Sequence, residues 1–118
     1  MQDCHRVPAQ AKQPLKDLYT AFEDLAISLG DDVTKKTLKY YFAFRRLKNF
    51  ACVEVHPATQ TLVVFLKVDP STVTLEDGFT RDVSKLGHYG TGDLEVRIRS
   101  REDLDKAEPL IRHSYEAS

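Results

Sequence analysis

The stretch "FACVEVHPATQTLVVFLKV", residues 50–68, decides the fold of this chain. Its apolar residues alternate with period two on each side of the turn "HPATQ", a pattern typical of two β-strands joined by a short connection. In the second strand Leu62, Val64 and Leu66 share one face, while Val63 and Phe65 share the other. Because the connection is short, the two strands are predicted to pair in antiparallel fashion.

Two further strands are predicted on either side of this hairpin. In "TLKYYFAF", residues 37–44, the alternation places Tyr40, Phe42 and Phe44 on one face, which we expect to lie in the core. This strand and the hairpin form three consecutive strands, so we expect an antiparallel meander. The stretch "DLEVRIRS", residues 93–100, resumes the alternation and predicts a fourth strand.

Helical periodicity appears near the two ends of the chain. Residues 14–29 carry apolar side chains at steps of three and four, and Gly30 is expected to end this helix in a left-handed conformation. Ser100 resembles the N-cap of a last helix, within which Pro109 should cause a kink. The prediction is an α+β domain: N-terminal helix, meander of three strands, long loop at 69–92 with a short helical turn, fourth strand and C-terminal helix. We expect both helices on one face of the sheet.

The length of 118 residues fits one domain, with a flexible N-terminal arm at 1–13 and a single α+β domain at 14–118. No apolar run is long enough to span a bilayer, and the N-terminus has no secretory signal, so we expect a cytoplasmic location and no membrane partner. Cys4 and Cys52 form no disulfide framework. We expect neither a cofactor nor a metal.

The basic residues are distributed unevenly. No acidic residue lies between Asp32 and Glu54, whereas six lysines and arginines do, interleaved with aromatic residues. Basic side chains beside exposed aromatic rings can bind phosphates and stack on unpaired bases. The residues predicted to contact nucleic acid, on a basic outer face of the sheet, are Lys39, Tyr41, Arg45, Arg46, Arg97 and Arg99. The alternative is an ordinary solvated face, on which Glu54 and Glu95 pair with the arginines.

The segment "RDVSKLGHYGTGD", residues 81–93, contains a glycine cluster. Its G-x-x-G-x-G spacing matches neither common phosphate-binding loop, and a strand rather than a helix follows it, so we favour a tight turn. The alternative is a small-ligand or anion-binding loop, in which His88 would be the group that titrates near neutral pH. The residues of this candidate ligand loop are Arg81, Asp82, Gly87, His88, Gly90, Gly92 and Asp93.

No arrangement of residues points to catalysis. Cys52 and His56 are four residues apart on one predicted strand, hence about 13 Å apart, too far for a nucleophile and its base. We therefore predict no catalytic residues and a domain that is not an enzyme, although catalytic use of His88 remains an alternative. A third possible role is a structural or dimerisation module.

Three segments carry a family resemblance: "YYFAFRRLKNFACVEV", "LVVFLKVDP" and "RDVSKLGHYGTGDLEVRIRSREDLDKAEPLIRHSYE". Over about residues 14–117 the chain resembles a small prokaryotic domain family of unassigned function. Its members occur alone or at the C-terminus of larger proteins, including nuclease-like and restriction-associated ones, and some are labelled "predicted transport protein". The positions that match its signature are Tyr41, Arg45, Arg81, Asp82, Ser84, Gly87, His88, Gly90, Gly92 and Asp93.

The resemblance implies an accessory domain with nucleic acid or a nuclease-type protein as its partner. It supplies no catalytic residues. These 118 residues contain no counterpart of the larger nuclease-like region of some relatives, so we expect no nuclease activity of this domain, and no residue supports the transport label.

Overall fold

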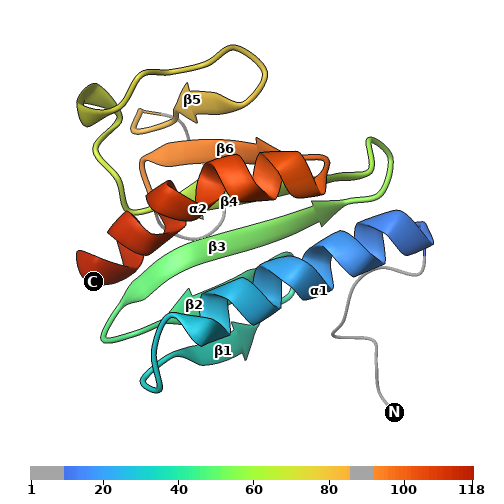
Figure 1. Cartoon of the computed structure of the whole chain (residues 1–118), viewed down its shortest axis with the longest axis horizontal. Coiled ribbons are helices and arrows are strands. Elements are labelled where there is room, and N and C mark those ends of the chain that lie inside the picture. Colours follow the sequence, from blue (N-terminus) through green and yellow to red (C-terminus); the bar gives the residue numbers. More distant parts are fainter. Residues whose placement is uncertain (1–9, 86–91) are drawn as a thin grey trace.

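The computed structural model describes residues 10–85 and 92–118 of the chain (Figure 1). The expected ligand-loop residues Gly87, His88 and Gly90, and most of the expected N-terminal arm, lie outside these ranges. The described elements, in chain order, are α1 (Gln13–Ser28), β1 (Thr34–Thr37), β2 (Phe42–Arg45), β3 (Asn49–His56), β4 (Thr61–Leu66), the 3-10 helix η2 (Pro70–Thr72), β5 (Thr80–Asp82), β6 (Leu94–Ile98) and α2 (Arg101–Glu116).

The strands form one antiparallel sheet in the order β1-β2-β3-β4-β6-β5. The predicted meander is present as β2-β3-β4, and the predicted fourth strand, β6, joins the sheet beside β4. The two helices cover the same face of the sheet (Figure 1). The α+β class and the position of both helices are therefore confirmed.

The predicted strand at residues 37–44 is wrong in one respect, because the chain reverses direction within it. Strand β1 ends at Thr37, and β2 begins at Phe42 and pairs with β1 in antiparallel fashion. The backbone N–H of Leu38 donates to the carbonyl of Tyr41 at 2.9 Å and closes the turn. Tyr40 is consequently exposed at the tip of the hairpin, not buried in the core as expected.

The long loop contains the expected helical turn and an additional strand. Asp69 caps η2 by accepting a hydrogen bond from the N–H of Ser71 at 3.0 Å. Strand β5 pairs with β6 and forms one edge of the sheet. With only three residues, β5 is too short for a period-two pattern to reveal it.

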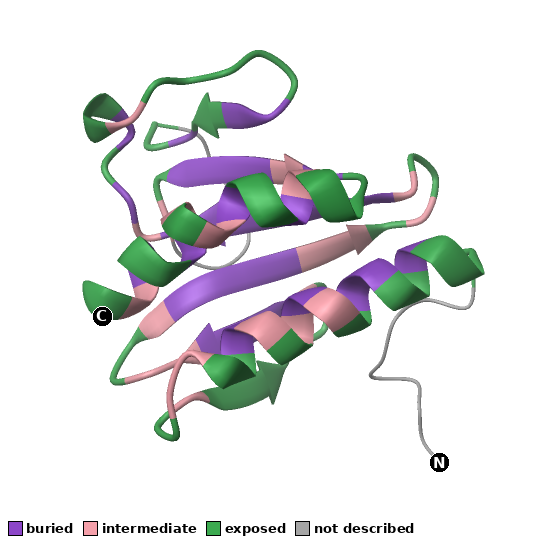
Figure 2. Cartoon of the chain, viewed as in Figure 1, coloured by how far each residue is buried: buried purple, intermediate pink, exposed green. Residues whose placement is uncertain are grey.

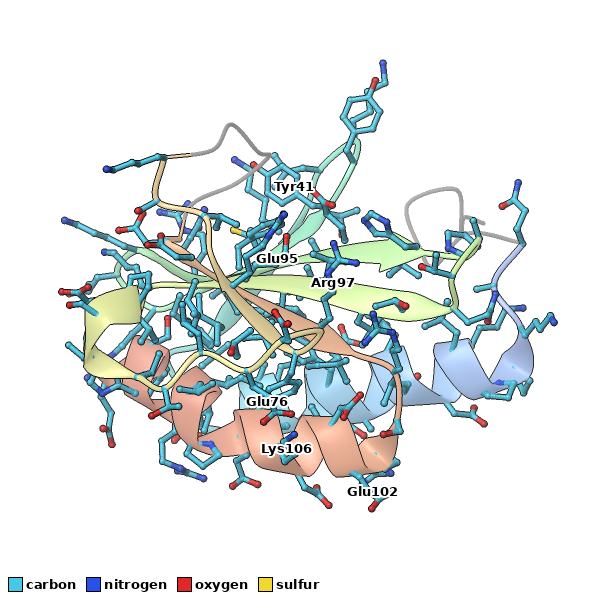
Figure 3. The ribbon with its side chains drawn as sticks, turned by 90° about the horizontal axis from the view of Figure 1, so that it is seen from above. Tyr41, Glu76, Glu95, Arg97, Glu102 and Lys106 are labelled. Atoms are coloured by element: carbon cyan, nitrogen blue, oxygen red, sulfur yellow. The ribbon has the colours of Figure 1, made fainter. Side chains whose placement is uncertain are left out.

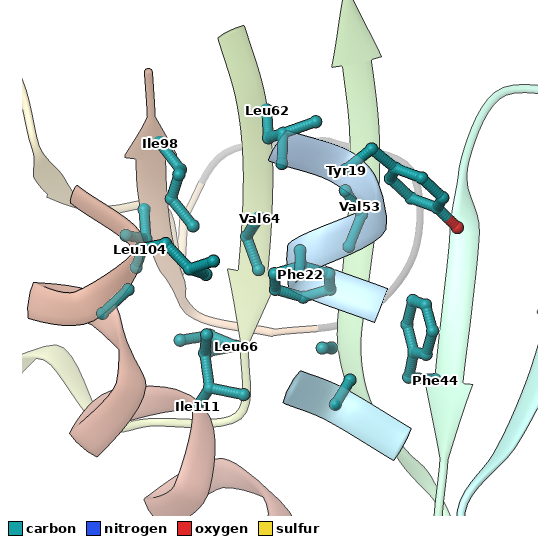
Figure 4. Close-up of a cluster of buried hydrophobic side chains, with 14 of the residues drawn as sticks. Tyr19, Phe22, Phe44, Val53, Leu62, Val64, Leu66, Ile98, Leu104 and Ile111 are labelled. Carbon is teal, nitrogen blue, oxygen red and sulfur yellow. The ribbon is translucent and has the colours of Figure 1, made fainter. Parts of the chain in front are cut away.

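The main core fills the space between the helices and the sheet (Figure 2). Phe22 of α1 packs edge-on against Phe44 of β2, with ring centroids 5.5 Å apart. Leu104 and Ile111 of α2 lie over β4 and β6 (Figure 4). Each such buried side chain stabilises the fold by about 1.5–3 kcal/mol relative to exposure. The helices are therefore held by their apolar stripes, as the periodicity predicts.

The ends of the helices differ in how well the sequence predicts them. The side chain of Ser100 caps α2 by accepting from the N–H of Asp103 at 3.1 Å, as expected. Helix α2 runs on through Pro109, which is exposed. Gly30, however, does not adopt the expected left-handed conformation. Its missing side chain instead leaves room for the hydroxyl group of Tyr115, against which a β-carbon would collide.

Candidate functional site

The sheet face opposite the helices, here called the outer face, has an apolar centre. Alternation directs Ala43, Cys52, Val63 and Phe65 to this face, and all four are buried. Val83, Leu38 and Tyr41 pack against them. The middle of the outer face is therefore a second hydrophobic cluster, whose side chains are packed against one another and buried. Such an apolar surface is unsuited to binding a charged ligand.

This cluster divides the basic residues that were expected to form one patch. Arg45 ends β2 and Arg97 lies in β6, and two strands, β3 and β4, separate β2 from β6 in the sheet. The idea of one continuous basic face is therefore wrong, since it required these strands to be neighbours. Figure 3 shows Tyr41 on the side of the sheet away from the helices. Arg97 lies beside Glu95, apart from Tyr41.

Several of the predicted contact residues have partners within the protein. Arg97 Nε donates to Glu95 Oε1 at 3.0 Å, and Arg99 Nη1 donates to the carbonyl of Gly78 at 2.9 Å. The solvated-face alternative expected Glu54 and Glu95 to pair with arginines across strands; Glu95 does so with Arg81 of β5, whereas Arg97 is its neighbour on β6 and Glu54 pairs with His56.

Two further cations of the predicted set, Arg46 and Lys39, lie in turns. Arg46 Nε donates to Asp32 Oδ2 at 3.0 Å, and its guanidinium stacks on the ring of Tyr115. Lys39 lies in the turn between β1 and β2, with its ammonium over the ring of Tyr40. Neither Arg46 nor Lys39 lines the pocket described next.

Arg45 and Tyr41 are brought together at a pocket of about 370 Å³ on the outer face, which we call the basic pocket. Its lining residues are Lys36, Leu38, Tyr41, Arg45, Lys48, Asn49 and Lys67.

The strand register explains how these residues meet. Lys36 of β1 lies opposite Ala43, whose side chain faces the outer side. Arg45 lies opposite Asn49 after a bulge at the end of β2. Lys67 directly follows β4 and alternates with the core residue Leu66, so it faces outward.

The basic pocket is positively charged. Four of its lining residues are cations and none is a carboxylate. Among the described residues, the ion pairs with lysine, arginine or histidine involve other side chains: Lys35, Arg46, His56, Arg81, Arg97, Lys106 and Arg112. A group of cations without carboxylates in a concave site favours an anionic ligand. Sequence reasoning missed Lys67, because it lies far along the chain from the other basic residues.

The described part of the candidate ligand loop is occupied by internal contacts. Asp82 Oδ1 accepts from the N–H of Ser84 at 2.9 Å and from its hydroxyl at 2.7 Å, and these bonds lower the pKa of Asp82. Arg81 pairs with Glu95. Asp93 is exposed. Its backbone N–H donates to the carbonyl of Leu66 at the end of β4, and its carbonyl accepts from the N–H of Val83, which follows β5.

Gly92 has a packing role. Its φ is +131°, and a β-carbon there would lie 2.8 Å from the carbonyl oxygen of Leu66. Asp93 N–H donates to that same oxygen at 3.1 Å. Glycine is therefore required at this position by backbone conformation and by close approach of the chain to β4.

The described residues form no evident metal centre. They contain no group of three or more histidine, cysteine or acidic side chains placed to hold a metal ion. Cys52 is buried, and His56 Nε2 lies 2.8 Å from Glu54 Oε1. Of the helices described, none combines the length and the apolar character needed to cross a membrane.

Fold and site together define a small α+β domain with an antiparallel sheet, two helices on one face and a basic pocket on the other. The chain belongs to the family described as a domain of unknown function, DUF5655, which it matches over residues 7–118. It is also similar to a Haemophilus influenzae protein that bears the name "Uncharacterized protein", with 26% identity over 100 residues. The match covers 85% of this chain but only 32% of that protein. No solved structure matches the chain.

Proposed function

We propose that this domain binds nucleic acid through the basic pocket. The observation that supports the proposal is the cluster of Lys36, Arg45, Lys48 and Lys67 around a concave site that no carboxylate lines. Since the whole chain has a formal net charge of −1, this local positive charge is not a consequence of a basic composition. It would attract a polyanion to one place on the surface.

The arrangement of the cations suits a chain of phosphates. Lys36, Arg45 and Lys67 come from β1, β2 and the end of β4, and Lys48 comes from the turn before β3. Neighbouring strands lie about 4.8 Å apart, so the cations form a row across the sheet and not a single point of charge. A row of this kind can contact successive phosphates of one strand.

Tyr41 adds an aromatic ring to the same pocket. Base stacking on an aromatic side chain contributes about 1–3 kcal/mol per base and favours single-stranded nucleic acid. Of the residues predicted to contact nucleic acid, Tyr41 and Arg45 line the pocket, and Lys36, Lys48 and Lys67 join them in the proposal. Lys39, Arg46, Arg97 and Arg99 are assigned no direct part in this site.

The accessory character of the domain is part of the proposal. A similar segment makes up about a third of the Haemophilus influenzae protein, so the fold also occurs within a longer chain. We propose that it supplies binding and no catalysis, and that a nuclease-type protein would be a fitting partner. The cytoplasmic location stays a prediction.

Binding of labelled oligonucleotides, measured by fluorescence anisotropy at two salt concentrations, tests this function. We expect single strands to bind more tightly than duplexes, and higher salt to weaken binding. The double variant K48A/K67A should bind at least tenfold more weakly. The matched control is K16A/R101A, which removes the same charge from exposed positions on the two helices. Equal binding by the two variants, or no binding by the parent protein at low salt, would contradict the proposal.

A further inference from the structure

A buried carboxylate lies between two arginines at the other side of the outer face. Glu95 Oε2 accepts from Arg81 Nη2 at 3.0 Å, and Glu95 Oε1 accepts from Arg97 Nε at 3.0 Å. The side chain of Glu95 is only 5% exposed, whereas those of Arg81 and Arg97 are 56% and 40% exposed. The two guanidinium groups are therefore held close together by one carboxylate, with much of each still open to solvent.

The strand register dictates this arrangement. Arg81 of β5 lies directly opposite Glu95 of β6, and Arg97 is two residues further along β6 on the same face. On the other side, Glu95 is paired with Phe65 of β4, whose side chain belongs to the apolar cluster of the outer face. A carboxylate beside that cluster loses water, and the arginines compensate for the loss.

The same residues line a second pocket, of about 250 Å³. Arg99 also lines it, and its Nη1 donates to the carbonyl of Gly78 at 2.9 Å. The lining carries three arginines against the carboxylates of Glu95 and Asp77, which leaves one net positive charge. We call this site the arginine pocket; its residues are Asp77, Gly78, Phe79, Thr80, Arg81, Glu95, Arg97 and Arg99.

The buried ion pairs have a use beyond stability. Burying a charge costs solvation free energy that its partner often fails to repay, so a buried carboxylate is a weak device for stabilising a fold. It does, however, hold a guanidinium in one orientation. The guanidinium group of each arginine in the pocket makes one described hydrogen bond and retains further N–H donors in its planar fork. Arginines fixed in this way are suited to bidentate recognition of a phosphate group.

We propose that the arginine pocket is a second anion site, which binds one phosphate group between Arg81, Arg97 and Arg99. Glu95 acts as a positioning residue: it orients the two forks and does not touch the ligand. The site does not depend on the proposed function of the basic pocket, since the two pockets share no lining residue. The phosphate could belong to a small phosphorylated molecule or to a nucleic-acid backbone.

An NMR titration of the ¹⁵N-labelled protein, observing the arginine side-chain Nε–Hε signals, tests this inference. The ligands are inorganic phosphate in one arm and a short oligonucleotide without terminal phosphates in the other. We expect saturable shifts for Arg81, Arg97 and Arg99 in at least one arm, and the responding arm identifies the source of the phosphate. No saturable shift of these three signals in either arm would overturn the proposal.

Charge-conserving variants make the test specific. R81K/R97K keeps both positive charges beside Glu95 but removes the planar forks, so we expect phosphate binding about tenfold weaker. The control R112K changes an arginine that pairs with Glu108 on the surface of α2. Binding weakened equally by both changes, or by neither, contradicts the role of the forks. Should R81K/R97K fail to fold, R99K gives the same comparison, because it keeps the charge and removes the fork of Arg99, whose partner is a backbone carbonyl, and leaves Glu95 paired.

Discussion

The hydroxyl of Tyr115 donates a hydrogen bond to Asp32 Oδ1 at 2.7 Å and so connects the last turn of α2 to the loop after α1. Arg46 joins them from the turn between β2 and β3, where its Nε donates to Asp32 Oδ2 and its guanidinium lies 4.8 Å from the centre of the Tyr115 ring. Gly30 lies directly against the tyrosine hydroxyl. Three segments distant in sequence thus meet at one polar cluster.

Y115F should make the protein less stable in a pH-dependent way. The tyrosine hydrogen bond is the largest of the effects that lower the pKa of Asp32, followed by the contact with Arg46. A carboxyl whose pKa is lower in the folded protein stabilises it above the pKa of the unfolded chain, about 3.9, and loses this effect as the pH falls. The melting temperature of Y115F should therefore lie below that of the parent protein at pH 7, with a smaller difference near pH 3.

The control for this prediction is the same substitution in a D32N background. With no carboxylate at position 32, Y115F should lower the melting temperature by an amount that does not change between pH 3 and pH 7. A pH-dependent difference that persisted in this background would show that another group is responsible.

S114A should destabilise the fold by about 1–3 kcal/mol. Ser114 of α2 is completely buried; its hydroxyl accepts from the N–H of Lys67 at 2.8 Å and donates to the carbonyl of Phe50. The substitution removes both contacts between α2 and the sheet. Urea unfolding measures the effect, and S118A, whose hydroxyl only donates to a carbonyl at the end of α2, should change the unfolding free energy by less than about 0.5 kcal/mol.

G92A should cost more than G78A. Both glycines have positive φ, but a β-carbon at position 92 would meet the backbone of Leu66, whereas one at position 78 has no atom within 4 Å. We expect a loss of about 1–2 kcal/mol for G78A, from backbone strain alone, and a loss of more than about 3 kcal/mol for G92A. Equal losses in a denaturant titration would contradict the packing role of Gly92.

Some of this fold can be predicted from local patterns because those patterns reflect burial. The alternation from Leu62 to Val68 predicts β4 correctly, since one of its faces packs against the helices. The stripe in α1 and the cap at Ser100 are equally local. The hairpin of β1 and β2 is missed because its turn contains neither glycine nor proline, and because the apolar alternation continues through Tyr40 into β2.

The candidate site depends on strand order, which no local pattern specifies. The alternation predicts both Arg45 and Arg97 as outward-facing strand cations, but β3 and β4 lie between their strands, so the two arginines line separate pockets. Lys67 joins the basic pocket only because β4 returns beside β3. The burial of Glu95, which organises the arginine pocket, likewise follows from its pairing with Phe65 and Arg81.

The most direct test of the central claim is to locate bound nucleic acid on the protein. Backbone amide signals of the ¹⁵N-labelled protein, recorded during titration with a short single-stranded oligonucleotide at low salt, report which residues contact it. We predict that the largest shifts fall at Lys36, Tyr41, Arg45, Lys48 and Lys67, and that they disappear in K48A/K67A. Shifts confined to the helices, or none at saturating oligonucleotide, would contradict a nucleic-acid site at the basic pocket.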